Sequence, residues 1–241
     1  MQIVGIIPAR YASTRFPGKP LILIDGKTMI RRVYEQAIQA KNIDKIIVAT
    51  DDSRIVDEVQ SFGGNVVMTD AHHQNGTSRI AEALTSLPQN FDAAINIQGD
   101  EPFIHPSQLD ELAAQLKNDT TQIVTLIKKI DDPLLLSTPS IIKVVKDKNN
   151  KALYFSRNAI PFFRDVAIEN WIEKHTYYKH IGIYGFKTSI LQQLVQLAPS
   201  ALETAENLEQ LRWLENGYSI DLLETTLESV SIDTPADLER I

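Results

Sequence analysis

Residues 3–20 read IVGIIPARYASTRFPGKP and join a continuous apolar run to a loop bounded by prolines. An apolar run such as residues 3–7 is typical of a β-strand that is buried on both faces, as in a parallel sheet. The loop that follows carries Arg10, Arg15 and Lys19 and contains no acidic residue. The segment therefore predicts the first strand of an α/β sheet, followed by a loop of local positive charge.

Strand-like apolar runs and helical periodicities alternate through the first half of the chain. The runs are Lys45–Thr50, Val66–Met68 and Phe91–Gln98, and the helical patterns fall at about residues 29–38, 53–62, 77–87 and 106–117, the last with Ser107 as its N-cap. This alternation predicts a three-layer α/β/α domain with a mostly parallel central sheet. Ligands bind such sheets in loops beyond the carboxyl ends of the strands, which here are residues 8–20, 50–52 and 98–102.

The second half of the chain is richer in strands than in helices. Its strand-like segments are Ile123–Ile130, Ile141–Lys146, Ala152–Ser156 and His180–Phe186. They predict an antiparallel extension of the sheet at about residues 120–190, which we interpret as an interface arm. A helix at Thr204–Asn216, a strand at Tyr218–Leu223 and a short helix from Thr234-Pro235 complete a single domain over residues 1–241.

Composition narrows the class of partner. The chain has 241 residues, a formal net charge of −7 and no cysteine. General nucleic-acid binders carry a positive stripe, so we expect no nucleic-acid partner. No apolar run approaches the roughly 20 residues of a membrane span, so we expect no membrane partner. The lack of cysteine excludes disulfides and thiolate metal sites, and it fits a cytoplasmic location.

The basic loop is a candidate site for a nucleoside triphosphate. Arginine forks suit bidentate phosphate contacts, and a lysine acts as a movable point charge. The loop matches neither GxxxxGK[ST] nor GxGxxG, which disfavours P-loop and dinucleotide-binding readings. The alternative is a solvated surface loop. The predicted nucleotide contacts here are Pro8, Ala9, Arg10, Ser13, Thr14, Arg15 and Lys19.

A carboxylate follows the fourth strand in the sequence Asn96-Ile97-Gln98-Gly99-Asp100-Glu101-Pro102. Mg²⁺ prefers hard oxygen ligands, commonly one or two carboxylates together with phosphate oxygens and water. Asp100 is therefore the first candidate for a metal ligand. A capping role for Asp100 within a turn is the alternative.

Several motifs together resemble one enzyme family. IIPARYASTRFPGKPL at 6–21 resembles the signature of the 3-deoxy-manno-octulosonate cytidylyltransferases. Further similar blocks follow in order: IIVATDD at 46–52, GGNVVMTDAHHQNGTSRIAEA at 63–83, NIQGDEPFI at 96–104, IKVVKD at 142–147, ALYFSRNAIPF at 152–162, HIGIYGF at 180–186, LEQLRWLENG at 208–217 and DTPADLE at 233–239. The resemblance covers nearly the whole chain.

The resemblance implies a fold like that of the nucleotide-diphospho-sugar transferases and a homodimer. It implies transfer of CMP from CTP to 3-deoxy-D-manno-octulosonate (Kdo), with Mg²⁺ and release of pyrophosphate, for lipopolysaccharide biosynthesis. The expected reaction is an in-line displacement at the α-phosphorus of CTP by the anomeric hydroxyl of Kdo.

The resemblance implies that residues of this chain at positions matching the family's motifs are its site residues. The implied catalytic residues are Arg10, Lys19, Asp100 and Asp233, with Asp100 and Asp233 as the metal ligands. Asp51, Asn75, Gly76 and Thr77 join the nucleotide contacts, and Arg79, Gln98, Arg157, His180, Tyr184, Glu209 and Gln210 form the sugar-acid contacts. One departure stands before Asp233, where Leu227-Glu228-Ser229-Val230 replaces an expected glycine-rich approach.

Alternatives remain at this point. Adjacent His72 and His73 suggest zinc in isolation, but no further ligand is suitably spaced. Capping residues and surface charges are the ordinary explanation for each proposed sugar contact. Another sugar nucleotidyltransferase, such as one acting on sialic acid, is the nearest rival, and no residue excludes an amino-substituted Kdo. A non-catalytic nucleotide-binding regulator is the rival of another class.

Overall fold

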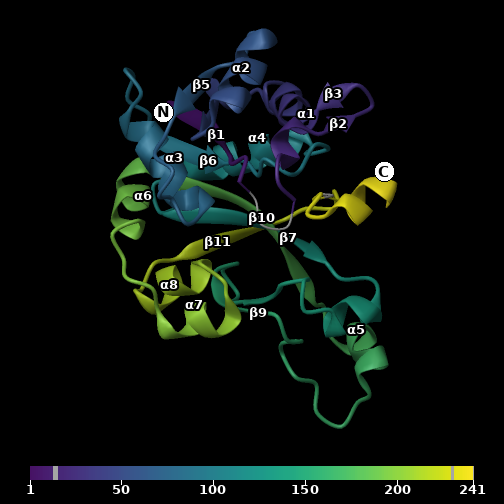
Figure 1. The fold of residues 1–241 in the computed structure, drawn as a ribbon. Coiled ribbons are helices and arrows are strands. Elements are labelled where there is room, and N and C mark those ends of the chain that lie inside the picture. The colour runs from purple at the N-terminus through teal and green to yellow at the C-terminus, as the bar shows by residue number, and fades with distance from the viewer. Residues whose placement is uncertain (13–15, 229–230, 241) are drawn as a thin grey trace.

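The computed structural model describes residues 1–12, 16–228 and 231–240. In these residues a mixed sheet of nine strands lies between two layers of helices (Figure 1). The main strand order is β11 (Ile220–Glu224), β7 (Ile123–Lys129), β10 (Tyr178–Lys187), β6 (Ala93–Asn96), β1 (Ile3–Ala9), β4 (Lys45–Thr50) and β5 (Val66–Met68). A hairpin of β8 (Lys143–Lys146) and β9 (Ala152–Ser156) joins the sheet through β10.

Four of the six neighbouring pairs along the main strand order run parallel. β1 pairs in parallel with β4 on one side and with β6 on the other. β10 runs antiparallel to both β6 and β7, and so it lies inside the sheet rather than at its edge. The predicted mostly parallel sheet with antiparallel strands from the second half of the chain is therefore confirmed.

Helices cover both faces of the sheet. α1 (Met29–Ala37), α2 (Ser53–Ser61) and α4 (Pro106–Leu116) pack into one apolar cluster, and α3 (Gly76–Thr85), α6 (Thr188–Leu194) and α8 (Gln210–Glu215) pack into the other. Strand β1 supplies both clusters because successive side chains alternate across a sheet. Val4 and Ile6 lie in the α3 layer, and Ile3 and Ile7 lie in the α1 layer.

Three local predictions were wrong or incomplete. The N-cap of α4 is His105 instead of Ser107, in a capping box with Gln108. The single helix expected over Thr204–Asn216 is two helices, α7 (Ala201–Glu206) and α8, because Asn207 has a φ of 52° and ends α7. A short hairpin of β2 (Leu23–Ile24) and β3 (Lys27–Thr28) was not foreseen.

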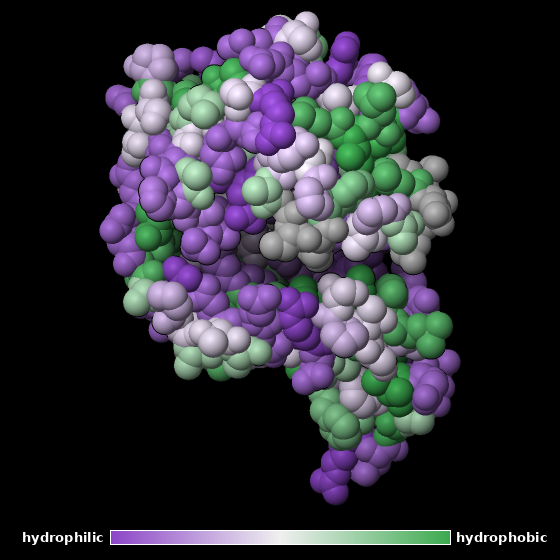
Figure 2. Space-filling model, viewed as in Figure 1, coloured by the Kyte–Doolittle hydropathy of each residue, from purple (hydrophilic) through white to green (hydrophobic). Residues whose placement is uncertain are grey.

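Part of the segment at 120–190 projects from the main body at the foot of Figure 1. It contains α5 (Trp171–Lys174) and has a small core of its own, formed by Ile130, Leu136, Trp171 and Tyr177. Figure 2 shows hydrophobic residues gathered on this projecting part, whereas hydrophilic residues prevail beside the central hollow. Within the described ranges, no helix has the length and apolar character needed to cross a membrane.

Candidate active site

The site begins where β1 and β6 end side by side. These strands are parallel neighbours, and Ile6 pairs with Asn96, so the loops that follow them leave the same edge of the sheet. Gly99 brings the two loops together, since a Cβ atom at this position would lie 2.7 Å from the carbonyl oxygen of Pro8. A glycine is required for so close a backbone approach, and it places Asp100 beside the basic loop.

A cavity of about 190 Å³ lies at this junction. Its lining draws on β1 and the loop after it, the amino end of α3, and the loop after β6. The lining residues are Pro8, Ala9, Arg10, Lys19, Pro20, Asn75, Gly76, Arg79, Gln98, Gly99 and Asp100. The structure thus brings together predicted contacts that are far apart in the sequence.

Lys19 lies between the two predicted metal ligands. Its Nζ is 2.8 Å from a carboxylate oxygen of Asp100 and 3.3 Å from one of Asp233. The ammonium group shows that both carboxylates face a common cation position. Two carboxylates suit Mg²⁺, which completes its shell with phosphate oxygens and water. The residues therefore fit a divalent metal that binds together with a triphosphate.

Asp233 reaches this position without the expected glycine-rich approach. The backbone N–H of Ile232 donates to the carbonyl oxygen of Asp100 at 2.9 Å, and the Ile232 side chain is buried against Ile24 and Met29. The carboxylate of Asp237 accepts from the backbone N–H of Thr234. The segment is thus tied to the loop after β6, although residues 229–230 lie outside the described chain.

The basic loop is closed at its base. The N–H of Gly18 donates to the carbonyl oxygen of Tyr11 at 2.9 Å, and Gly18 has a φ of 72°, which favours glycine. The guanidinium carbon of Arg54 lies 3.3 Å from the centre of the Tyr11 ring. Three predicted contacts of this loop, Ser13, Thr14 and Arg15, lie outside the described residues.

The amino end of α3 links the predicted nucleotide and sugar-acid residues. Asn75 caps the helix by accepting from the N–H of Ser78 at 2.8 Å, and its amide donates to Glu209 at 2.9 Å. The hydroxyl of Thr77 donates to the other oxygen of Glu209 at 2.8 Å. Glu209 therefore joins the start of α8 to the start of α3.

Burial raises the pKa of Glu209 to about 7, which predicts a specific pH effect on stability. Between the ordinary carboxyl pKa and about 7, the folded state holds a proton that the unfolded state has released. The free energy of unfolding therefore falls as pH rises through this window, by up to about 3 kcal/mol from this group.

Glu209→Gln removes that contribution, so the difference in stability between the variant and the parent should move in the variant's favour from pH 5 to pH 8. Urea unfolding at several pH values measures this difference. Parallel stability curves for the two proteins would contradict the assigned pKa.

Polar groups of β6 and β10 lie buried near Glu209. The Tyr184 hydroxyl and the Asn96 side-chain oxygen are both buried and have no hydrogen-bond partner within the described residues. Burial and the charge of Glu209 raise the pKa of Tyr184, so its hydroxyl stays a donor at neutral pH. Such unsatisfied groups suit a polyhydroxylated ligand. The sequence did not single out Asn96 as a candidate contact, although this residue ends the strand that leads to Asp100.

His180 lies next to this polar region. Its Nε2 is 3.0 Å from the hydroxyl of Thr125, and its ring packs against that of Tyr184. Burial lowers the pKa of His180 to about 3, so the imidazole is neutral near pH 7.

Two predicted glutamine contacts have different surroundings. Gln210 is buried in the first turn of α8, and the Gln98 amide donates to the carbonyl oxygen of Gly182 at 2.6 Å. His180 and Gln210 stay predictions as sugar-acid contacts.

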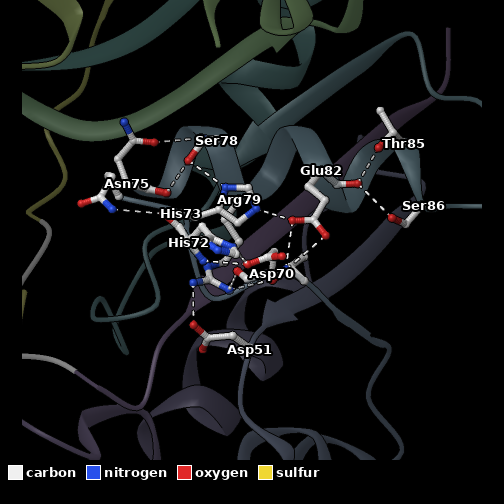
Figure 3. Close-up of polar contacts among 12 residues, drawn as sticks. Asp51, Asp70, His72, His73, Asn75, Ser78, Arg79, Glu82, Thr85 and Ser86 are labelled. Atoms are coloured by element: carbon white, nitrogen blue, oxygen red, sulfur yellow. Dashed lines mark hydrogen bonds and ion pairs between the residues drawn. The ribbon is translucent and has the colours of Figure 1, made fainter. Parts of the chain in front are cut away.

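Two residues that were predicted to contact the sugar acid, Arg79 and Arg157, have hydrogen-bond partners within the protein. Arg79 is only 1% exposed, forms an ion pair with Asp51 at 2.9 Å, and donates to Thr69 at 2.6 Å (Figure 3). The guanidinium of Arg157 donates to the carbonyl oxygens of Pro139, Glu206 and Asn207. Arg157 is outside the cavity lining, whereas Arg79 is in the lining and pairs with Asp51. The roles of Asp51, Arg79 and Arg157 as ligand contacts stay predictions.

The sheet, the basic loop and the paired carboxylates define a nucleotidyltransferase of the α/β class. A family model described as cytidylyltransferase matches residues 4–225. The chain therefore belongs to the cytidylyltransferase family. Full-length relatives confirm the predicted resemblance to 3-deoxy-manno-octulosonate cytidylyltransferases.

Relatives match over essentially the whole chain. The chain is 54% identical to a 3-deoxy-manno-octulosonate cytidylyltransferase from Cytophaga hutchinsonii and 53% identical to one from Bacteroides thetaiotaomicron, each covering 100% of this chain and 96% of the relative. The solved structure of a CMP:2-keto-3-deoxy-manno-octonic acid synthetase complexed with CTP superposes with a TM-score of 0.92 at 41% identity, covering 100% of this chain and 96% of that one.

Proposed function

We propose that this protein transfers CMP from CTP to Kdo, forming CMP-Kdo and pyrophosphate for lipopolysaccharide biosynthesis. The observation that carries the proposal is the convergence of Asp100 and Asp233 on Lys19, beside the basic loop and within one cavity. The relatives that bear this enzyme name span the same length and share about half of the residues.

The residues divide between holding the triphosphate and holding the sugar acid. Lys19 and Arg10 neutralise phosphate oxygens and stabilise the departing pyrophosphate. A divalent cation, for which we propose Mg²⁺, would be held by Asp100 and Asp233 and would supply charge neutralisation at the phosphates and orientation of the reactants. The buried Tyr184 hydroxyl donates to a hydroxyl or carboxylate oxygen of the sugar acid.

A pyrophosphate-release assay across nucleotides and acceptors tests this function. CTP with Kdo should give the highest kcat/KM, above other nucleoside triphosphates and above sialic acid as the acceptor. Faster turnover of an amino-substituted Kdo would reassign the acceptor. Binding of CTP without pyrophosphate release from any acceptor would favour a non-catalytic regulator and overturn the proposal.

We also propose that the protein is a cytoplasmic homodimer that pairs through the segment at 120–190. Three large apolar side chains of this segment are exposed: Leu134, Leu153 and Phe162, the last at 76%. Exposed apolar side chains of this size support an association surface on this segment.

Phe162→Asp combined with Leu153→Asp should raise the dimer dissociation constant by about 100-fold or more, since both changes place charge in an apolar interface. Sedimentation equilibrium measures the constant. Leu23→Asp is the matched control, because Leu23 is 68% exposed but lies in the β2–β3 hairpin. Equal dissociation constants for the two variants would contradict this interface.

A further inference from the structure

The two adjacent histidines lie in different surroundings. The side chain of His72 is 90% exposed and contacts Asp70 within its own segment. The side chain of His73 is 16% exposed and contacts two residues of α3. Its Nδ1 lies 3.0 Å from the Ser78 hydroxyl, and its Nε2 contacts the Glu82 carboxylate (Figure 3). Only the second histidine therefore connects the segment before α3 to the helix itself.

Glu82 gathers further contacts from the same segment. Its two carboxylate oxygens lie 3.1 and 3.0 Å from the backbone nitrogen of Asp70, which donates to them. Ser78 and Glu82 are four residues apart and so share one face of α3. The hydrogen bond from His73 lowers the pKa of Glu82 and keeps it an acceptor at neutral pH. These contacts fasten residues 70–75 along the side of the helix.

Residues 70–75, held in this way against α3, end at Asn75 and contact Arg10, and both of these residues line the cavity. The carbonyl oxygen of His73 accepts from the Arg10 guanidinium at 3.4 Å. The Ser78 hydroxyl lies 3.2 Å from the carbonyl oxygen of Asn75, and the Asn75 side chain in turn caps α3 and contacts Glu209. The place of Arg10 and Asn75 therefore depends on how His73 is held.

A nucleophilic role for the same residues is less well supported. Serine, histidine and glutamate in mutual contact occur in hydrolytic triads. Here the Ser78 hydroxyl already has an acceptor in the Asn75 carbonyl within its own helical turn. A single hydroxyl hydrogen serves either that carbonyl or the imidazole, so the arrangement is better suited to holding backbone than to activating an oxygen.

We propose that His73, held by Glu82 and Ser78, is a positioning residue that sets Arg10 and Asn75 for the nucleotide. This inference rests on the proposed use of CTP, but it assigns a role to residues that do not themselves need to contact the substrate. His72 has no such role, although it is the same residue type at the next position.

The test compares His73→Phe with the matched control His72→Phe. His73→Phe should weaken CTP binding, measured by calorimetry without sugar acid, by about 5- to 20-fold, as expected for losing charge-assisted hydrogen bonds. Its KM for CTP should rise by a similar factor, and its kcat should change less than about threefold. His72→Phe should leave both constants within about twofold of the parent. His73→Gln keeps a donor for Glu82 and should recover most of the affinity.

A double-mutant cycle with Glu82→Ala separates positioning from general destabilisation. The effects of His73→Phe and Glu82→Ala on CTP affinity should be strongly non-additive, because both remove one contact. Thermal unfolding of each variant shows whether the protein stays folded at the assay temperature. Additive effects, or equal losses in the His72 and His73 variants, would overturn the proposal. Failure of the parent protein to bind CTP would instead refute the proposed function.

Discussion

Asp100→Asn should lower kcat for pyrophosphate release by about 10³-fold or more, because it removes one of two carboxylates that face the common cation position. The protein should remain folded. The amide has the size of the carboxylate, the Asp100 carbonyl oxygen still accepts from Ile232, and Lys19 still pairs with Asp233. Single-turnover kinetics at saturating CTP and magnesium measure the chemical step directly.

The matched control is Asp119→Asn, which neutralises an exposed carboxylate outside the cavity. Its turnover should equal that of the parent, and the thermal midpoints of both variants should lie close to the parent value. Near-normal turnover of Asp100→Asn with magnesium would show that Asp100 is not a metal ligand. A large loss of folded protein would show that its main role is structural.

The sequence predicted best those elements that local pattern determines. The strands at Lys45–Thr50, Val66–Met68 and Ala152–Ser156 have the predicted bounds. The dipeptide Asp25-Gly26 is a sequence signal that could have predicted the β2–β3 hairpin, since Asp-Gly favours two-residue turns. Both residues adopt the positive φ that such turns require. The pattern of apolar residues did not reveal the break between α7 and α8. That break lies at Asn207, which has a positive φ, and Arg157, just after β9, donates to the carbonyl oxygens of Glu206 and Asn207 there.

The sequence could not predict which side chains form ion pairs across the fold. Family resemblance assigned Asp51 to the nucleotide and Arg79 to the sugar acid, but it gave no sign that the two side chains pair with each other. Only the packing of α3 against β4 brings them within 2.9 Å. Lys19 shows the same limit, because it is 81 and 214 residues away from the carboxylates that it joins. Resemblance named the candidate site residues, whereas the structure shows which of their side chains pair with one another.

Lys19→Met should lower kcat/KM for CTP by about 10²- to 10³-fold, since the variant loses the cation that we propose stabilises the pyrophosphate leaving group. The ligand-free variant should also be less stable than the parent. Without the ammonium, the negative charges of Asp100 and Asp233 lose the cation that lies between them. Steady-state kinetics and thermal unfolding without metal measure the two effects separately.

Magnesium should then stabilise Lys19→Met more than it stabilises the parent protein. In the parent, the ammonium already occupies the position that both carboxylates face, and it competes with a divalent cation when no triphosphate is bound. In the variant that competition is gone, so binding of the metal to the folded state raises the thermal midpoint further. Lys19→Arg keeps the positive charge and should show the smaller, parent-like response. An equal response of all three proteins to magnesium would mean that the carboxylates beside Lys19 do not form the metal site.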